Sequence, residues 1–149
     1  MYNYLSKFSS FLNPEISHFL FLNFLKLNFL RRIYDNKLLN VSLFGIDFPN
    51  PLGIAAGFDK NAESIEGILN LGFGFAEVGT VTPFSQEGNI KPRIFKIPEC
   101  EAVIQRLGFN NKGVKFFINN LANYKKKKLN GIIGVNIGKN KNSENYFLD

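Results

Sequence analysis

The sequence predicts an α/β fold in which parallel strands alternate with helices, preceded by an N-terminal α-helical pair. Three observations support this prediction. Residues 1–32 carry Phe and Leu at helical spacing. After residue 41 the apolar period shortens, and apolar runs of a few residues are bounded by glycine or proline. From residue 52 onwards such runs alternate with segments of helical period, which is the order typical of parallel βα units.

Composition and charge limit the classes of partner. The 149 residues have the length of one domain, and their net charge of +6 favours anionic partners such as lipid headgroups, phosphates or carboxylates. A single solvated lysine run at 125–128 is the alternative explanation of that charge. Because basic residues are spread along the chain without a recognised motif, we expect no nucleic-acid partner. One cysteine, Cys100, and one histidine, His18, cannot form a zinc site by themselves, and no metal site is predicted.

The N-terminal segment contains two predicted helices, the first over residues 4–12. Asn13 followed by Pro14 predicts the start of the second, because an Asn side chain caps helices and proline at the first helical position loses no hydrogen bond. This second helix is expected to run to about Arg32. It is too short and too interrupted by polar residues to span a hydrocarbon core of ~30 Å. We therefore predict a helical pair lying in a membrane interface, with a pair packed on the domain body as the alternative.

The remaining elements follow in order along the chain. Residues 41–44 and 46–48 predict a hairpin around Gly45, and the apolar runs at 52–56, 75–79 and 132–137 predict three buried parallel strands. Asn61 is expected to cap a helix that Gly72 ends, and a second amphipathic helix is expected after Gly113. One strand-like run, residues 93–97, lies in the irregular segment that precedes the second of these helices. This pattern alone also permits a small open sheet.

Polar and small residues follow the end of each predicted parallel strand, at 55–61, 79–83 and 136–141. The carboxyl ends of parallel strands share one edge of a sheet, and ligands bind there in α/β folds. Small residues allow a flat ligand to approach the backbone, and Lys60 offers a cation to an anionic group. The three strand ends together predict a polar ligand with a planar part.

Five strings of residues, in order along the chain, carry a resemblance to a known family. They are NPLGIAAGFDKN (50–61), GFGFAEVGTVTP (72–83), KPR (91–93), RLGFNN (106–111) and GVNIGKNK (134–141). Through them, and through residues 14–18, the chain resembles the N-terminal portion of class 2, quinone-dependent dihydroorotate dehydrogenases. The resemblance implies a partial (β/α)8 TIM barrel with about three of eight strands. Residues 1–40 would be a helical extension associated with membrane and quinone, and residues 41–149 the truncated N-terminal part of the FMN-binding barrel.

The activity implied by the resemblance is oxidation of dihydroorotate to orotate, with FMN and a membrane quinone, in de novo pyrimidine (UMP) biosynthesis. Residues 1–32 would hold the protein peripherally on the cytoplasmic side of a bacterial inner membrane or an organellar equivalent. The alternative is a catalytically inactive truncated or degraded remnant that adheres to membranes without turnover.

The resemblance also implies site residues. The positions that match FMN contacts are Ala56, Gly57, Phe58, Asp59, Lys60, Thr80 and Asn136. The positions that match substrate contacts are Lys60, Gln105, Arg106, Leu107, Gly108 and Phe109. His18 and Lys96 match the quinone pocket. Two positions depart from the family pattern: Gln105 stands where an Asn is usual, and Lys96 where an Arg is usual, which keeps the charge but loses the fork geometry.

The catalytic base implied by the resemblance is a serine that follows the fourth barrel strand, and we expect it beyond Asp149. Ser143 directly follows the third strand end and is not that serine. The resemblance therefore places no catalytic residue in these 149 residues, and we expect the chain alone to be inactive.

Overall fold

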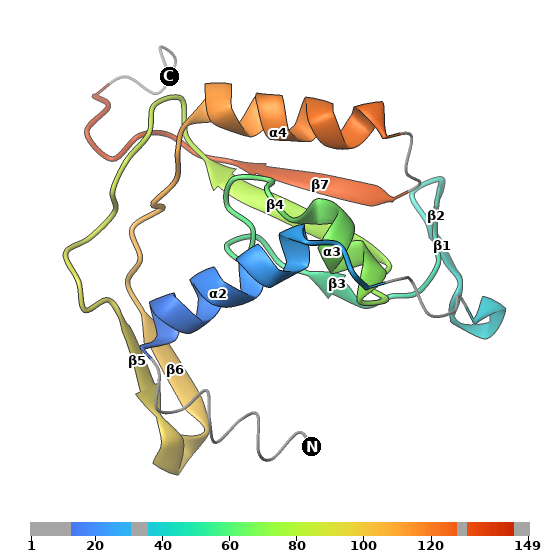
Figure 1. Ribbon diagram of the computed structural model, residues 1–149, viewed down its shortest axis with the longest axis horizontal. Helices are drawn as coiled ribbons and strands as arrows, with labels where there is room; N and C mark the ends of the chain where they lie inside the picture. The colour runs from blue at the N-terminus through green and yellow to red at the C-terminus, as the bar shows by residue number, and fades with distance from the viewer. Residues whose placement is uncertain (1–12, 31–35, 128–130, 145–149) are drawn as a thin grey trace.

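The computed structural model describes residues 13–30, 36–127 and 131–144 (Figure 1). The predicted helix over 4–12 lies outside the described residues, as do Arg31 and Arg32 at the predicted end of the second helix. The described helices are α2 (Pro14–Lys26), α3 (Ile65–Asn70) and α4 (Val114–Lys126). The strands are β1 (Val41–Leu43), β2 (Ile46–Phe48), β3 (Gly53–Ile54), β4 (Phe75–Val81), β5 (Ile94–Ile97), β6 (Ala102–Gln105) and β7 (Ile132–Ile137). Short 3-10 turns cover Lys37–Leu39 and Pro98–Cys100.

Three parallel strands form the central sheet in the order β3–β4–β7 (Figure 1). This order confirms the predicted parallel arrangement of the strands. β3 is shorter than the predicted strand over 52–56, because Gly57 adopts a φ of 100° and turns the chain out of the ladder. Within the described part of the chain the sheet is open, with β3 and β7 at its edges.

The hydrophobic core lies between one face of this sheet and the helices. Ala76 and Val78 alternate with Glu77 along β4, so the two apolar side chains share the buried face and Glu77 lies on the other. The buried apolar residues form one cluster: Leu25, Ala62, Ile65, Ile68, Leu69, Ala76, Val78, Val81, Phe117 and Tyr124. Because α2, α3 and α4 all contribute, α2 is part of the folded body.

Helix α2 begins where the sequence predicts and ends earlier. The Asn13 side chain accepts hydrogen bonds from the N–H groups of Glu15 and Ile16, which confirms the predicted cap. The helix stops at Lys26 rather than near residue 32, since Asn28 adopts a left-handed φ of 55°. No helix within the described ranges has the length and apolarity needed to cross a bilayer.

A close backbone contact seats α2 on α3. A Cβ atom at Gly67 would lie 2.3 Å from the Leu25 carbonyl oxygen, so glycine allows the two helices to approach. Alanine is intrinsically better than glycine inside a helix by ~1 kcal/mol. At this position the clash with backbone outweighs that gain.

We expect Gly67→Ala to lower the free energy of unfolding by roughly 1–3 kcal/mol, the usual cost of overpacking a core. Urea denaturation measures it. Gly134→Ala is the matched control, because a Cβ there would meet Glu77 at 3.4 Å, an ordinary contact. Equal stability of Gly67→Ala and the wild type would show that the α2–α3 contact is not as close as described.

The start of α3 differs from the prediction. Ser64 occupies the N-cap position without a side-chain cap bond, and the Asn61 side chain instead accepts from the Lys112 N–H (2.9 Å). The Asp59 carboxylate accepts from the N–H groups of Glu63 (2.9 Å) and Ser64 (2.7 Å). The prediction of Asn61 as the cap was therefore wrong: Ser64 is the N-cap residue, and the Asp59 carboxylate holds the turn that precedes the helix.

Two antiparallel hairpins extend from the sheet. β1 pairs with β2 as predicted. β5 pairs with β6, and together they project from the lower edge of the molecule beside α2 (Figure 1). The sequence predicted only the first strand of this second hairpin, because every residue of β6 is exposed and the strand has no buried face to impose an alternation.

Candidate functional site

The carboxyl ends of the three parallel strands meet as expected. The N–H of Gly57 donates to the Gly79 carbonyl (2.7 Å), and the Thr80 hydroxyl donates to the Asn136 side-chain oxygen (2.6 Å). A Cβ at Gly79 would lie 2.3 Å from the Asn136 carbonyl oxygen, so only glycine allows this approach. The first, second and third strand ends therefore form one continuous polar surface.

Lys60 lies at the centre of this surface and lines two adjoining cavities. Burial lowers the pKa of its ammonium below the ordinary value, and the charge of Arg93 lowers it further. The Lys60 ammonium forms no hydrogen bond or ion pair with any residue in the described ranges. A half-buried cation without a partner is suited to bind an anionic ligand group.

Asp59 has a structural position beside Lys60. Its side chain is 1% exposed and holds the turn before α3, while its carbonyl oxygen accepts from the Gly79 N–H (3.0 Å). Burial raises the pKa of Asp59 although two backbone N–H groups donate to its carboxylate. The side chain thus points into the protein, and its backbone is the part that borders the strand ends.

The smaller cavity, of about 300 Å³, lies between the strand ends and the 105–109 loop. Its wall includes Ala56, Gly57, Lys60, Thr80, Asn89, Gln105, Arg106, Leu107, Gly108 and Phe109. All the residues expected to contact substrate are therefore brought together. Two of their side chains are already engaged: Gln105 accepts from the Leu107 N–H (3.0 Å), and the Arg106 guanidinium lies over the Phe95 ring and donates to the Pro92 carbonyl (3.3 Å).

The larger cavity, of about 970 Å³, lies between α2 and the 55–61 loop. His18 of α2 reaches across it, and its Nε2 lies 2.7 Å from the Phe58 carbonyl oxygen. Because a carbonyl only accepts, Nε2 carries the proton and Nδ1 is an acceptor. Burial lowers the pKa of His18, so the imidazole is neutral near pH 7. Lys96 lies on β5 opposite Val103, and the described wall of this cavity includes Ile94 but not Lys96.

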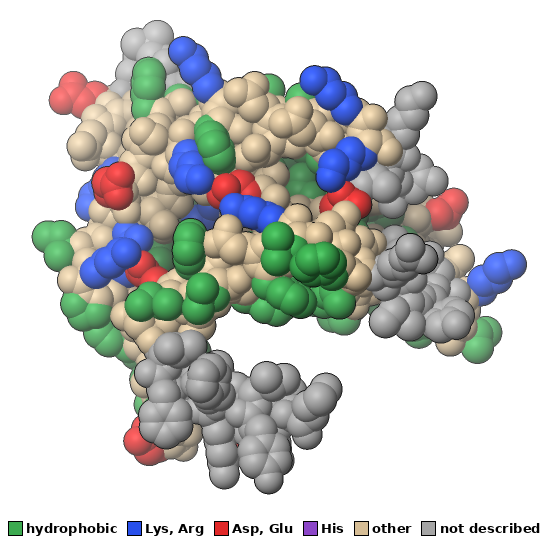
Figure 2. All heavy atoms as spheres, viewed as in Figure 1, with side chains coloured by type: hydrophobic (Ala, Val, Ile, Leu, Met, Phe, Trp, Pro, Cys, Tyr) green, Lys and Arg blue, Asp and Glu red, His purple; other side chains and the backbone are tan. Residues whose placement is uncertain are grey.

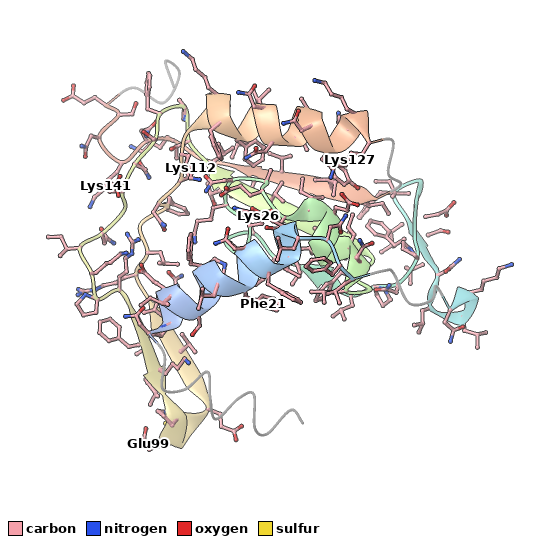
Figure 3. The ribbon with its side chains drawn as sticks, viewed as in Figure 1. Phe21, Lys26, Glu99, Lys112, Lys127 and Lys141 are labelled. Carbon is pink, nitrogen blue, oxygen red and sulfur yellow. The ribbon has the colours of Figure 1, made fainter. Side chains whose placement is uncertain are left out.

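A charged bridge closes one end of the larger cavity. The Glu63 carboxylate forms ion pairs with the ammonium groups of Lys26 on α2 (2.9 Å) and Lys112 (3.2 Å). Both lysines are labelled in Figure 3. Burial acts to raise the pKa of Glu63, but the two lysines outweigh it and lower the pKa. This bridge ties α2 to the segment that leads into α4.

Sequence reasoning missed two residues of the site, Glu77 and Asn89. Glu77 accepts from the Asn136 side-chain amide (3.0 Å) and so orients the group that meets Thr80. A carboxylate in the middle of an apolar strand was the signal for it. Asn89 lines the smaller cavity from the irregular segment 82–92. This segment has no hydrophobic period that would single out one of its residues. Within the described ranges, no group of three or more His, Cys, Asp or Glu side chains could hold a metal ion.

Comparisons with known proteins find relatives of the chain by sequence. The family model described as dihydroorotate dehydrogenase matches residues 38–149. A relative from Coxiella burnetii (strain Dugway 5J108-111), named dihydroorotate dehydrogenase (quinone), is 48% identical over 145 residues, which cover 94% of this chain and 41% of the relative. The protein of the same name from Buchnera aphidicola subsp. Schizaphis graminum is 47% identical over 150 residues, covering 97% of this chain and 44% of the relative.

Solved structures give the same result for the fold. The ligand-free structure of DHODH from Eimeria tenella superposes with a TM-score of 0.83 at 39% identity, covering 89% of this chain and 39% of that one. The structure of the same protein with ferulenol also gives a TM-score of 0.83. The chain thus spans about two fifths of the length of the proteins it matches.

Proposed function

The chain belongs to the dihydroorotate dehydrogenase family, and from that premise we propose that it is the N-terminal part of a quinone-type enzyme. That enzyme oxidises dihydroorotate to orotate in de novo pyrimidine biosynthesis. In this proposal the open sheet is the first three strands of a (β/α)8 barrel. Residues 41–149 form that part of the barrel, and residues 1–40 form a helical extension that meets membrane and quinone. The unpartnered Lys60 ammonium at the shared strand ends is the observation that carries the proposal.

FMN is the cofactor that we assign to the strand ends, and the residues there fit it. Gly57 has a φ of 100° and a Cβ there would meet nothing within 4 Å, so a flat ring has room against the backbone. Thr80 and Asn136 offer a hydroxyl and an amide beside it. Ala56, Phe58, Asp59 and Lys60 complete the proposed contacts. When bound, the flavin supplies the hydride acceptor, and the protein supplies binding and orientation.

Dihydroorotate is the proposed substrate of the smaller cavity. Its carboxylate would pair with the Lys60 ammonium, which is the only lysine on the described wall of that cavity. The 105–109 loop faces Lys60 across the cavity, and we assign its five residues to closing over the ligand. Because Gln105 already accepts from Leu107, its amide N–H groups are the part of the side chain left for a ligand oxygen.

Quinone is the proposed ligand of the larger cavity. His18 keeps its Nε2–H on the Phe58 carbonyl, so its Nδ1 can accept a hydrogen bond from a reduced quinone. The same bond joins α2 to the loop assigned to FMN, which brings the two ligands close. We assign Lys96 on β5 to a contact between its ammonium and the quinone head group. A lysine keeps the positive charge there but lacks the planar, forked geometry of an arginine.

Membrane association is proposed for residues 1–32. Hydrophobic side chains gather along α2 on the face shown in Figure 2, and several are more than 40% exposed: Ile16, Phe19, Leu20, Phe21, Phe24 and Leu27. An apolar patch of this kind marks an interaction surface. We therefore place the protein peripherally on a membrane, on the cytoplasmic side of a bacterial inner membrane or an organellar equivalent.

Replacing two of these side chains tests that surface. We expect the full chain to float with anionic vesicles at low salt, and the double variant Phe19→Ser, Phe24→Ser to stay in the soluble fraction. Each Phe removed from the apolar phase costs roughly 1.5–3 kcal/mol. The control is Leu38→Ser, Phe44→Ser, which replaces two side chains that are 91% and 98% exposed away from α2. Loss of flotation in the control as well would contradict a specific role for α2.

The alternative function is a membrane-adhering remnant without turnover, and one observation favours it. The acidic and imidazole side chains on the described wall of the larger cavity are all engaged. Glu15 pairs with Arg93, Asp59 accepts two N–H groups, Glu63 pairs with two lysines, and His18 binds the Phe58 carbonyl. The described smaller cavity has no acidic or imidazole side chain. No carboxylate on the described walls of the two cavities is therefore free to act as a general base.

A chimera tests the proposed function. Residues 1–149 replace the matching N-terminal segment of the Coxiella burnetii relative, and dihydroorotate-dependent quinone reduction is measured with added FMN. We expect turnover, because the chain would then supply the strand ends, Lys60 and the 105–109 loop to a complete barrel. A folded chimera that binds neither FMN nor orotate would refute the proposal in favour of the remnant.

A further inference from the structure

Arg93 joins the first turn of α2 to the segment before β5. Its side chain is only 6% exposed, and its Nε donates to Glu15 Oε1 (2.6 Å). Its Nη1 donates to the carbonyl oxygens of Glu87 (2.6 Å) and Asn89 (3.0 Å). A planar guanidinium can bind such groups in a fixed arrangement. The position of Glu15 and the position of residues 87–89 are therefore set by the same buried side chain.

Asn89 carries that connection to the 105–109 loop, because all its polar groups are engaged. Its N–H donates to the Leu107 carbonyl (3.0 Å), and its side-chain amide donates to the Arg106 carbonyl (2.8 Å). Its side-chain oxygen accepts from the Lys141 ammonium after β7 (3.2 Å). Its own carbonyl is held by Arg93. Asn89 is thus the point where α2, the loop and the third strand end are linked.

The packing around these bonds leaves no room for adjustment. A Cβ at Gly88 would lie 2.2 Å from the Leu107 carbonyl oxygen and 2.8 Å from Arg93 Nη1. A Cβ at Gly108 would lie 2.9 Å from the backbone nitrogen of Asn89. The Arg106 N–H donates back to the Arg93 carbonyl (2.8 Å). Because these close contacts and hydrogen bonds join Arg93 to the loop, we expect a shift of Arg93 to move the loop.

We propose that Arg93 and Asn89 are positioning residues that make the placement of the 105–109 loop depend on the docking of Glu15. This inference rests on the proposed function, in which that loop closes over dihydroorotate while α2 borders the quinone cavity. Docking of the membrane-facing helix and closure of the substrate site are then parts of one hydrogen-bonded network. Lys91, which also pairs with Glu15 (2.9 Å), is 69% exposed and adds little to the network.

Hydrogen–deuterium exchange on the full 149-residue chain tests the network without any requirement for activity. Glu15→Gln keeps the size of the side chain but removes the charge that holds Arg93. We expect the amides of Asn89 and Arg106 to exchange about tenfold faster, the effect of weakening one charge-assisted hydrogen bond. The amides shared by β4 and β7 should exchange at the wild-type rate. Asn89→Ala should expose the Arg106 amide to the same extent while α2 stays protected.

The matched control is Lys26→Met, which breaks the ion pair between Lys26 and Glu63 at the opposite end of α2. It should leave the Asn89 and Arg106 amides unchanged. Unchanged exchange in Glu15→Gln, or equal acceleration in Lys26→Met, would overturn the inference.

In the chimera, Glu15→Gln should raise KM for dihydroorotate about tenfold, with less change in KM for quinone, although Glu15 borders the quinone cavity. A change in KM for quinone alone would also overturn the inference. A chimera without turnover counts against the proposed function only, and hydrogen exchange then decides the inference.

Discussion

Purified residues 1–149, supplied with FMN and dihydroorotate, are expected to reduce quinone no faster than free FMN does. Every carboxylate on the described walls of the two cavities is already engaged, and general-base catalysis alone typically contributes ~10²–10⁴-fold. In (β/α)8 barrels the phosphate of a ligand is frequently held by loops after strands 7 and 8, whereas in the proposed barrel the sheet β3–β4–β7 supplies only the first three strands. FMN should therefore bind weakly or not at all, and the hydride acceptor would not be held.

The assay compares the chain with the chimera at equal concentration and under the same added FMN. Flavin fluorescence measures cofactor binding independently of turnover. Turnover by the chain above the free-flavin rate would contradict the expectation. It would mean that turnover needs no further general base and no phosphate-holding loops, or that a second chain supplies them. Size-exclusion chromatography of the active material would show such a second chain.

Replacing Lys60 should have the second large effect. In the chimera we expect Lys60→Met to raise KM for dihydroorotate roughly 10–100-fold, since a hydrogen bond to a charged group contributes about 1.5–3 kcal/mol. Methionine keeps most of the apolar stem and removes the ammonium. The matched control is Lys127→Met, which breaks only an exposed pair with Glu66 on the helical side of the sheet. An unchanged KM in Lys60→Met would show that the substrate carboxylate binds elsewhere.

The pH dependence of the same chimera gives an independent check. Burial and the charge of Arg93 lower the pKa of Lys60 below that of an ordinary lysine. Only the protonated ammonium pairs with a carboxylate, so affinity should be full below the lowered pKa and fall as the pH rises through it. The fall in 1/KM should therefore begin at a lower pH than for a solvent-exposed lysine. The Lys60→Met chimera should lack this step.

Local signals in the sequence were sufficient for most elements. The three parallel strands and α4 were predicted from apolar runs and helical period. The β1–β2 hairpin was predicted from two short apolar runs on either side of Gly45. Asn13 was identified as a cap because its side chain satisfies N–H groups only two and three residues away. The strand ends were predicted to lie together because parallel strands place their carboxyl ends at one edge of the sheet.

The errors have a common origin in pairing and capping contacts that leave no period in the sequence. Asn61 does not cap α3, because its side-chain oxygen accepts from the Lys112 N–H. The turn before α3 is held by the Asp59 carboxylate instead. β6 has no buried face and is a strand only through pairing with β5. The end of α2 depends on the left-handed turn at Asn28, where the Asn70 amide donates to the Asn28 side chain across 42 positions.

The sequence by itself determined the order of the parallel strands and the helices between them, the residues at the strand ends and the family resemblance, because these depend on period and on contiguous strings. Only the tertiary structure decided which polar groups remain available. Gln105, Arg106 and His18 are partly engaged by the protein, whereas Lys60 has no hydrogen-bond partner in the described ranges. The Glu15–Arg93–Asn89 network was likewise invisible, since it joins segments 78 residues apart. Hydrogen bonds between distant segments leave no period, and burial is a property of the packed chain rather than of any short string.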